Sequence, residues 1–169
     1  MSMSTTAQFR SSLQTVGSDS VVVGYDELGP TVDKLAHGPV VGAPLPFETS
    51  LGESSAINFD PTAAELRNSH TGVSGSELGV ASVGTVAIES RPHGDEIVSL
   101  YPQQHLLVIR EGDIVPDVAT AFRWLGDRFA EGRRSIILAT GPSATADMGE
   151  LVTGVHGPHE VTVVILADE

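Results

Sequence analysis

The residues best suited to chemistry lie near the end of the chain, in a loop that carries two histidines. The loop reads VTGVHGPH over residues 152–159. Gly154 and Gly157 flank His156 and let the backbone approach a ligand closely, while the proline that follows stiffens the exit from the loop. Because an imidazole changes its protonation near neutral pH, His156 and His159 could act as acid–base groups or as ligands. We predict His156 as a catalytic residue, with an ordinary loop histidine as the alternative; for His159 a solvated loop histidine is the better interpretation.

A second candidate site follows a predicted strand over residues 135–140. The sequence GPSATAD at residues 141–147 predicts a tight turn into a helix over residues 144–152, capped by Ser143. The free amides of such a helix would bind an anion, and ligands of open parallel sheets collect at the carboxyl ends of the strands. A capped helix without a ligand is the alternative. If this segment binds an anion, Gly141, Ser143 and Thr145 are the anion-binding residues and Asp147 is a second catalytic candidate.

A third histidine, His105, stands at the head of a predicted buried strand over residues 104–110. A lone histidine there is either a satisfied residue of the core or a ligand-binding group. No second pair of ligands at metal spacing accompanies the histidines, so no metal site is predicted. The chain has no cysteine, which excludes disulfides, thiolate nucleophiles and cysteine-ligated iron–sulfur clusters from it. Any electron transfer would therefore use a partner protein or a bound organic cofactor.

These residues must be positioned by a chain that alternates predicted strands and helices. The clearest helix covers residues 117–129, and another begins at residues 60–61 with Asp60 as its cap. Near-continuous apolar strands imply parallel pairing with helices on both faces. The predicted fold is an α/β three-layer sandwich with a mainly parallel sheet. Further strands are predicted at residues 20–25, 39–43, 85–90, 96–100 and 161–167, further helices near residues 7–16 and 30–37, a turn or short helix at residues 76–80, and an irregular crossing or lid at residues 44–58.

The length of 169 residues fits one domain. The polar residues 1–18 predict a flexible N-terminal segment or one loose helix, and residues 19–169 predict a single α/β domain. The start of the chain lacks a basic region followed by an apolar run, and every apolar stretch is too short to span a bilayer. We therefore expect a cytoplasmic protein.

The chain is strongly acidic, with 22 Asp and Glu against 9 Lys and Arg, a net charge of −13, and Lys34 as its only lysine. Such a surface repels phosphate backbones and anionic lipid, so neither nucleic acid nor a membrane is expected as a partner. It also repels itself, and molar salt screens that repulsion within ~3 Å. An ordinary acidic protein is one interpretation; the near-absence of lysine favours a halophilic protein.

Four segments combine into one signature: ASVGT at residues 81–85, SLYPQQH at 99–105, GPSATAD at 141–147 and LVTGVHGP at 151–158. Together they resemble the lactate utilisation (LUD) domain family and, within it, the lactate utilisation protein C group, from residue 74 to the C-terminus. The resemblance implies a sheet of the sugar-phosphate isomerase and CoA-transferase-like type. It also implies a role in oxidising L-lactate to pyruvate beside iron–sulfur partner subunits. It adds three residues to the predicted ligand site, namely Gly84, Thr85 and His105.

The chain departs from the family pattern at several positions. Ser82 and Val83 stand where the family usually has an acid and a threonine, Ala144 where it has a basic residue, and Gly149 where it has an acid. Without that acid and base, an anion site would rest on backbone amides, which bind more weakly than amides with an arginine. We therefore predict an accessory subunit of a lactate-oxidising complex that binds a small anion at the 141–158 loops, with self-association into a homo-oligomer left open. The alternatives are a stand-alone enzyme acting on a phosphorylated sugar or an acyl-CoA, and a degenerate sensing or structural member.

Overall fold

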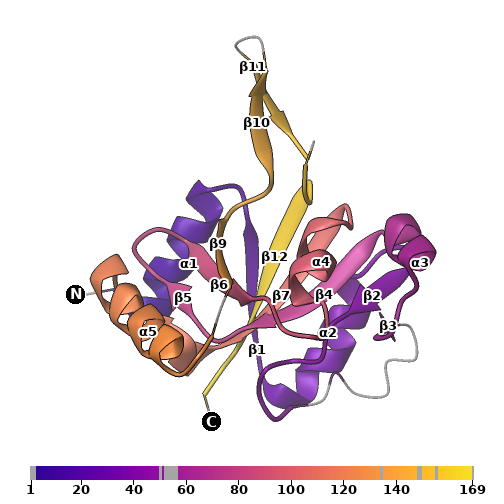
Figure 1. The fold of residues 1–169 in the computed structure, drawn as a ribbon. Coiled ribbons are helices and arrows are strands. Elements are labelled where there is room, and N and C mark those ends of the chain that lie inside the picture. The colour runs from indigo at the N-terminus through magenta and orange to yellow at the C-terminus, as the bar shows by residue number, and fades with distance from the viewer. Residues whose placement is uncertain are drawn as a thin grey trace.

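The computed structural model describes residues 3–49, 51, 57–133, 135–147, 150–154 and 156–168. In these ranges the chain forms a central sheet of six parallel strands in the order β1-β12-β7-β4-β2-β3 (Figure 1). The long apolar strand β7 is buried along almost its whole length, as expected for a sheet covered on both faces. The prediction of an α/β fold with a mainly parallel sheet is confirmed. The strands are β1 Asp19–Val23, β2 Val40–Gly42, β3 Ile57–Asn58, β4 Thr71–Ser76, β7 Gln104–Arg110 and β12 Glu160–Leu166.

A second sheet of four strands, which the sequence does not predict, packs against one face of the central sheet. Its order is β8-β5-β6-β9, and β6 runs antiparallel to both β5 and β9. Val86 and Ile88 of this sheet share an apolar cluster with Leu107 and Val163 of the central sheet. The strand predicted at residues 135–140 is therefore β9 of the second sheet, and the prediction of a parallel pairing for it is wrong. The strands are β5 Gly79–Val80, β6 Thr85–Glu89, β8 Ile114–Val115 and β9 Ile136–Thr140.

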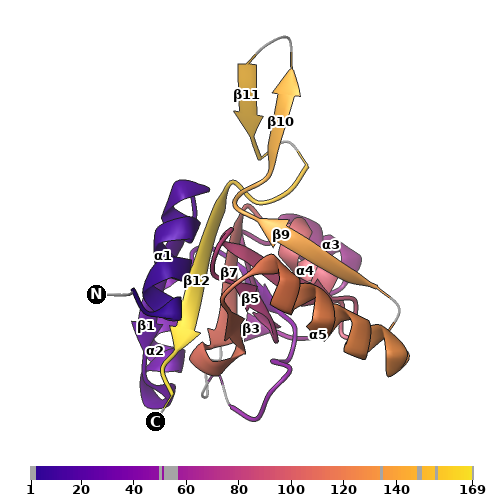
Figure 2. The same ribbon diagram turned by 90° about the vertical axis from the view of Figure 1, so that its left-hand side faces the viewer.

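Helices cover the sheets from both sides (Figures 1 and 2). Leu28 and Val32 of α2 pack with Val108 on one face of the central sheet. Helix α1 lies on the opposite face beside the smaller sheet, and α5 covers the outer side of that sheet through Ala121. Short 3₁₀ turns precede α2 and β8. The helices are α1 Thr5–Thr15, α2 Leu28–Leu35, α3 Ala63–Asn68, α4 Asp95–Leu100 and α5 Val118–Ala130.

The N-terminal segment contributes to the core. Phe9 and Leu13 of α1 are buried in the cluster between the two sheets, and the Ser4 hydroxyl caps the helix by accepting from the Ala7 amide at 3.2 Å. Residues that were assigned by their polarity to a flexible segment or a loose helix thus include a helix packed through one apolar face.

Residues 96–100, predicted as a strand, belong to helix α4. Asp95, Val98 and Ser99 are buried at helical spacing, and Val98 packs with Val41 of the central sheet. Asp95 also forms an ion pair with Arg91, which lies four residues earlier in the turn before the helix. The prediction failed because a run this short does not distinguish the two-residue alternation of a strand from the 3.6-residue period of a helix.

Strand β4 was not predicted because its sequence, TGVSGS, favours a turn. All six of its residues are nevertheless buried. A Cβ on Gly72 would lie 2.1 Å from the carbonyl oxygen of Val98, so only glycine lets α4 sit this close to the strand. Packing therefore outweighs β propensity here. Residues 76–80, predicted as a turn or short helix, contain the last residue of β4 and the whole of β5. In the predicted crossing at 44–58, residues 50 and 52–56 lie outside the described residues.

The prediction of a helix over residues 144–152 is wrong. This segment forms an antiparallel hairpin of β10 Ala144–Asp147 and β11 Glu150–Thr153. The hairpin projects from the body in both views (Figures 1 and 2). Its register places the β-branched residues Thr145 and Val152 opposite each other, a pairing that favours strands over a helix. Ser143 consequently caps no helix.

The predicted helix at residues 117–129 is confirmed as α5, where the Asp117 carboxylate accepts from the Thr120 amide at 2.8 Å. Helix α3 instead begins two residues later than predicted. Its cap is Thr62, which exchanges hydrogen bonds with Glu65 in a capping box, and not Asp60. Across the described ranges, no helix is both long and apolar enough to cross a membrane.

Candidate functional site

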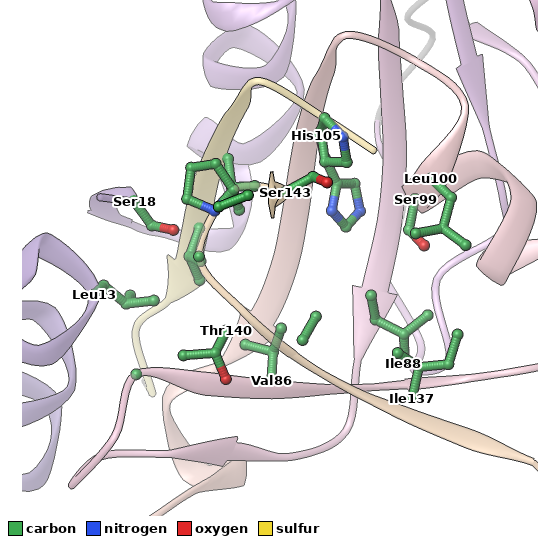
Figure 3. A pocket seen from close by; sticks show the side chains of 18 of the residues that line it. Leu13, Ser18, Val86, Ile88, Ser99, Leu100, His105, Ile137, Thr140 and Ser143 are labelled. Atoms are coloured by element: carbon green, nitrogen blue, oxygen red, sulfur yellow. The ribbon is translucent and has the colours of Figure 1, made fainter. Parts of the chain in front are cut away.

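A cavity of about 310 Å³ lies between the central sheet and the four-stranded sheet (Figure 3). Strands β6 and β9 form one side of its wall, β7 and β12 form the other, and α1, α4 and the loops at the base of the hairpin close it. A partly apolar cavity of this size is a usual place for a small-molecule site. Five predicted site residues line it: Gly84, His105, Gly141, Ser143 and His156.

The cavity lies at the amino ends of the parallel strands, whereas the sequence predicts a site at their carboxyl ends. The lining residues His105 and Val161 are the second residues of β7 and β12 and are partners in the parallel register. Strand β9 reaches the cavity with its carboxyl end, at Thr140, because it pairs antiparallel with β6. The loops on both sides of the hairpin therefore open at the amino edge of the central sheet.

Five predicted residues are not part of the cavity wall, and two of them, Gly154 and Gly157, line a neighbouring groove. Thr85 lies directly behind the cavity wall, with its Oγ1 2.7 Å from the Oγ1 of Thr140, which lines the cavity. Thr145 and Asp147 lie on β10, in the projecting hairpin, and the side chain of Asp147 is outside the described part of the structure. The two predicted catalytic residues therefore lie on different elements: Asp147 is on β10, and His156 is in the loop after β11.

His105 is a buried histidine in the cavity wall, with 3% of its surface exposed. Its Nε2 lies 2.8 Å from the hydroxyl of Ser74, which is itself fully buried on β4. Burial removes water from the ring and lowers its pKa to about 4, so the imidazole is neutral at neutral pH. Sequence reasoning missed Ser74, because the strand that carries it was not recognised.

Ser18 is a cavity residue that the sequence does not indicate. It follows the C-terminal end of α1, its surface is 3% exposed, and its Oγ has no hydrogen-bond partner in the described structure. Figure 3 shows this hydroxyl turned toward the interior of the cavity. A buried polar atom without a partner is rare and calls for an explanation.

Glycine at the 141 turn brings α1 to the cavity. Gly141 has φ +72°, and a Cβ there would lie 2.4 Å from the carbonyl oxygen of Val16. Gly84 makes a similar approach to the backbone of Ser12 and Leu13. These two predicted ligand-site glycines therefore serve the packing of α1, which closes one side of the cavity.

An outer groove of about 480 Å³ adjoins the cavity and is lined by the remaining two predicted glycines, Gly154 and Gly157. His156 and Leu100 line both the groove and the cavity. Both glycines are predicted to let a ligand approach, and both also lie close to side chains of the chain itself. A Cβ on Gly154 would lie 2.3 Å from the His159 ring.

The described part of the cavity wall contains no side chain with a permanent charge. Its lining residues there include serines, a threonine and two histidines, but no Asp, Glu, Lys or Arg. Among the residues that the structure describes, no three His, Asp or Glu side chains lie close enough together to hold a metal ion. The polar groups available for chemistry are thus hydroxyls, imidazoles and backbone amides.

The sequence model of the LUD domain matches residues 47–166 of this chain. The chain belongs to the LUD domain family. Lactate utilization protein C of Bacillus licheniformis is 31% identical over 124 residues, which cover 71% of this chain and 52% of that protein. The protein of the same name from Deinococcus radiodurans is 33% identical over 129 residues, covering 74% of this chain and 59% of the relative. This LUD chain therefore spans about half of the length of the curated relatives it matches.

A solved structure shows the same fold. The crystal structure of a DUF162 family protein from Deinococcus radiodurans matches this LUD domain with a TM-score of 0.78 at 23% identity, covering 98% of this chain and 99% of the other. At that identity the likeness concerns the fold alone.

The four segments of the LUD signature, at residues 81–85, 99–105, 141–147 and 151–158, all contribute to the cavity wall. They come from both sheets and from α4, so the fold brings together segments that are far apart in sequence. Of the departures from the family pattern, Ser82 and Val83 are exposed on the turn after β5, Ala144 lines the cavity, and Gly149 lies outside the described residues.

Proposed function

We propose that this chain serves L-lactate utilisation as an accessory subunit, beside iron–sulfur partner subunits that oxidise lactate to pyruvate. The proposal is supported above all by the LUD match over residues 47–166, together with relatives named Lactate utilization protein C. The oxidation removes a pair of electrons and the protons of the substrate's C–H and O–H groups. This chain has no cysteine that could ligate a cluster, so the proposal assigns the clusters to the partners.

Within that role, we assign the binding of a small carboxylate to the outer groove. His156 and His159 are both exposed there, beside Tyr101 and Gln103. A protonated imidazole forms a charge-assisted hydrogen bond with a carboxylate. Because the hairpin takes the place of the predicted helix N-terminus, the histidines and not helix amides carry this contact.

The cavity argues against a stand-alone enzyme that acts on a phosphorylated sugar or an acyl-CoA. Sites for phosphate groups ordinarily supply arginine or lysine, or the amides of a helix N-terminus. The described cavity wall has no arginine or lysine, and the segment after Ser143 is a strand. We therefore propose that the chain is not catalytic by itself.

The partner proposal is tested by a pull-down of the tagged protein from its native cells in high salt, with an unrelated acidic protein carrying the same tag as control. The eluate is assayed for iron–sulfur absorbance and for lactate-dependent reduction of a dye. We expect both to co-purify with the tagged chain. A chain that elutes alone, without lactate-dependent dye reduction, would contradict the proposed role.

The carboxylate site is tested by the shift in melting temperature that L-lactate causes in the purified chain. The variant His156→Ala/His159→Ala should lose this shift, because both imidazoles leave the groove. Ser82→Ala, a change of an exposed serine outside the groove, should keep it. An unchanged shift in the double variant would place the anion elsewhere.

A further inference from the structure

The inner cavity has an unused hydrogen-bonding group at one end. The hydroxyl of Ser18 is buried, turned toward the cavity and without a partner in the described structure (Figure 3). Its neighbour on the chain, Gly17, lies against Pro142 of the 141 turn, which holds this end of α1 at the wall. Buried hydroxyls normally have a partner, so this one fits a ligand that fills the cavity and bonds to it.

A second group of this kind is His105. Its Nε2 is occupied by Ser74 at 2.8 Å, whereas its Nδ1 has no hydrogen-bond partner among the described residues. If Ser74 donates to Nε2, then Nδ1 carries the proton and can donate to a carbonyl oxygen. In the other tautomer, Nδ1 accepts from a hydroxyl. Because burial keeps the ring neutral, it offers a ligand a hydrogen bond but no charge.

The rest of the wall is largely apolar. In Figure 3, Val86, Ile88 and Ile137 lie on one side of the cavity, with His105 and Ser143 on the other. No lysine or arginine lines the described wall, His105 is neutral, and His156 lies at the end that the exposed groove shares, so a carboxylate drawn deeper would lose its water without gaining a partner of opposite charge. The site for a small anion and the site for an apolar molecule are thus separate compartments of one depression.

The volume of about 310 Å³ has room for roughly ten water-sized groups, which is more than lactate would fill. We infer that the inner cavity is a binding site for an uncharged, largely apolar organic molecule of about the size of a fused two-ring compound, with a hydroxyl or carbonyl group that bonds to Ser18, while His105 offers a hydrogen bond to a second polar group. The molecule enters from the outer groove, which shares Leu100 and His156 with the cavity. This inference is independent of the role in lactate utilisation.

The first test compares two probes that share one ring system, β-naphthol and β-naphthoate, by fluorescence titration of the purified chain in high salt at neutral pH. The naphthol is uncharged and carries a hydroxyl, whereas the naphthoate carries a charge. We expect saturable binding of the naphthol at one site and affinity at least about tenfold weaker for the naphthoate. Absence of naphthol binding, or equal binding of the two probes, would overturn the inference.

The second test locates the probe with two substitutions in the wall. Ser18→Ala should weaken naphthol binding about tenfold by removing one hydrogen bond, and it should leave the melting temperature of the free chain equal or higher because the unpartnered hydroxyl is gone. Ala139→Leu should abolish binding, because Ala139 lines the cavity and the larger side chain fills it. The matched control is Ser82→Ala, an exposed serine outside the wall, which should bind like the wild type. If Ala139→Leu does not fold, Ser18→Ala and its control decide the question.

One further variant separates this inference from the lactate proposal. His159 lines the outer groove but not the inner cavity. His159→Ala should therefore weaken the stabilisation by L-lactate and leave naphthol affinity unchanged, and Ser18→Ala should do the reverse. Naphthol affinity that falls with His159→Ala and not with Ser18→Ala would place the probe in the groove and refute the inner site.

Discussion

Acidification should destabilise this protein in part through His105. Its buried ring has a pKa of about 4, against 6.5 for an ordinary histidine. As the pH falls below 6.5, the unfolded chain binds a proton at this ring, whereas the folded chain keeps it neutral down to about pH 4. The unfolded state binds more protons in this window, so the free energy of unfolding falls with the pH. The difference between 6.5 and about 4 corresponds to about 3 kcal/mol of lost stability.

Comparison with His105→Gln isolates this contribution from that of the many carboxylates. Glutamine does not titrate, and its amide can keep a hydrogen bond to Ser74. Urea unfolding in molar KCl at about pH 7.5 and about pH 4.5 should show the wild type losing roughly 2.5 kcal/mol more than the variant. The exposed His93 provides the matched control, and His93→Gln should lose as much as the wild type. If His105→Gln and the wild type lost equal stability, the argument from a buried neutral ring would be refuted.

Three further predictions concern packing, capping and charge. Gly72→Ala should lower the free energy of unfolding by about 3 kcal/mol, because its Cβ would lie 2.1 Å from the carbonyl oxygen of Val98. Gly126→Ala on α5, where a Cβ meets nothing within 4 Å, should raise it by about 0.5–1 kcal/mol, and similar urea curves for the two variants would contradict the packing argument. Asp117→Ala should cost about 1 kcal/mol, because the carboxylate caps α5 through the Thr120 amide at 2.8 Å; an unchanged melting temperature would count against the cap. The net charge of −13 predicts that the melting temperature rises steeply with KCl, and full stability in dilute buffer would exclude a halophilic protein.

The elements predicted correctly from the sequence are those with a long pattern of their own. Strands β7 and β12 are near-continuous apolar runs, which only a sheet covered on both faces can bury. Helix α5 has both an amphipathic repeat and a capping residue, Asp117. Local sequence was sufficient in these cases, because the period and the composition indicate the same structure.

Strand β4 and helix α4 were predicted wrongly because each depends on a segment farther along the chain. Gly72 makes room for the Val98 carbonyl, and neither segment alone reveals that contact. No local pattern records such a contact, so tertiary packing outweighs propensity there. The β10–β11 hairpin was missed for another reason: its two strands are neighbours in sequence, but each of them taken singly also fits a helix.

The sequence by itself determined that this chain has an α/β core, an acidic surface and no thiolate ligand, because composition and periodicity are local properties. It also predicted Gly84, His105, Gly141, Ser143 and His156 as site residues, which the fold gathers around one cavity. Only the tertiary structure decided that the cavity lies at the amino edge of the sheet, that Ser18 faces it without a partner, and that Ser74 holds a neutral His105 in its wall. The physical reason is that burial, desolvation and hydrogen-bond partnership depend on which distant segments meet, and here the antiparallel course of β9 and the packing of α1 determine that.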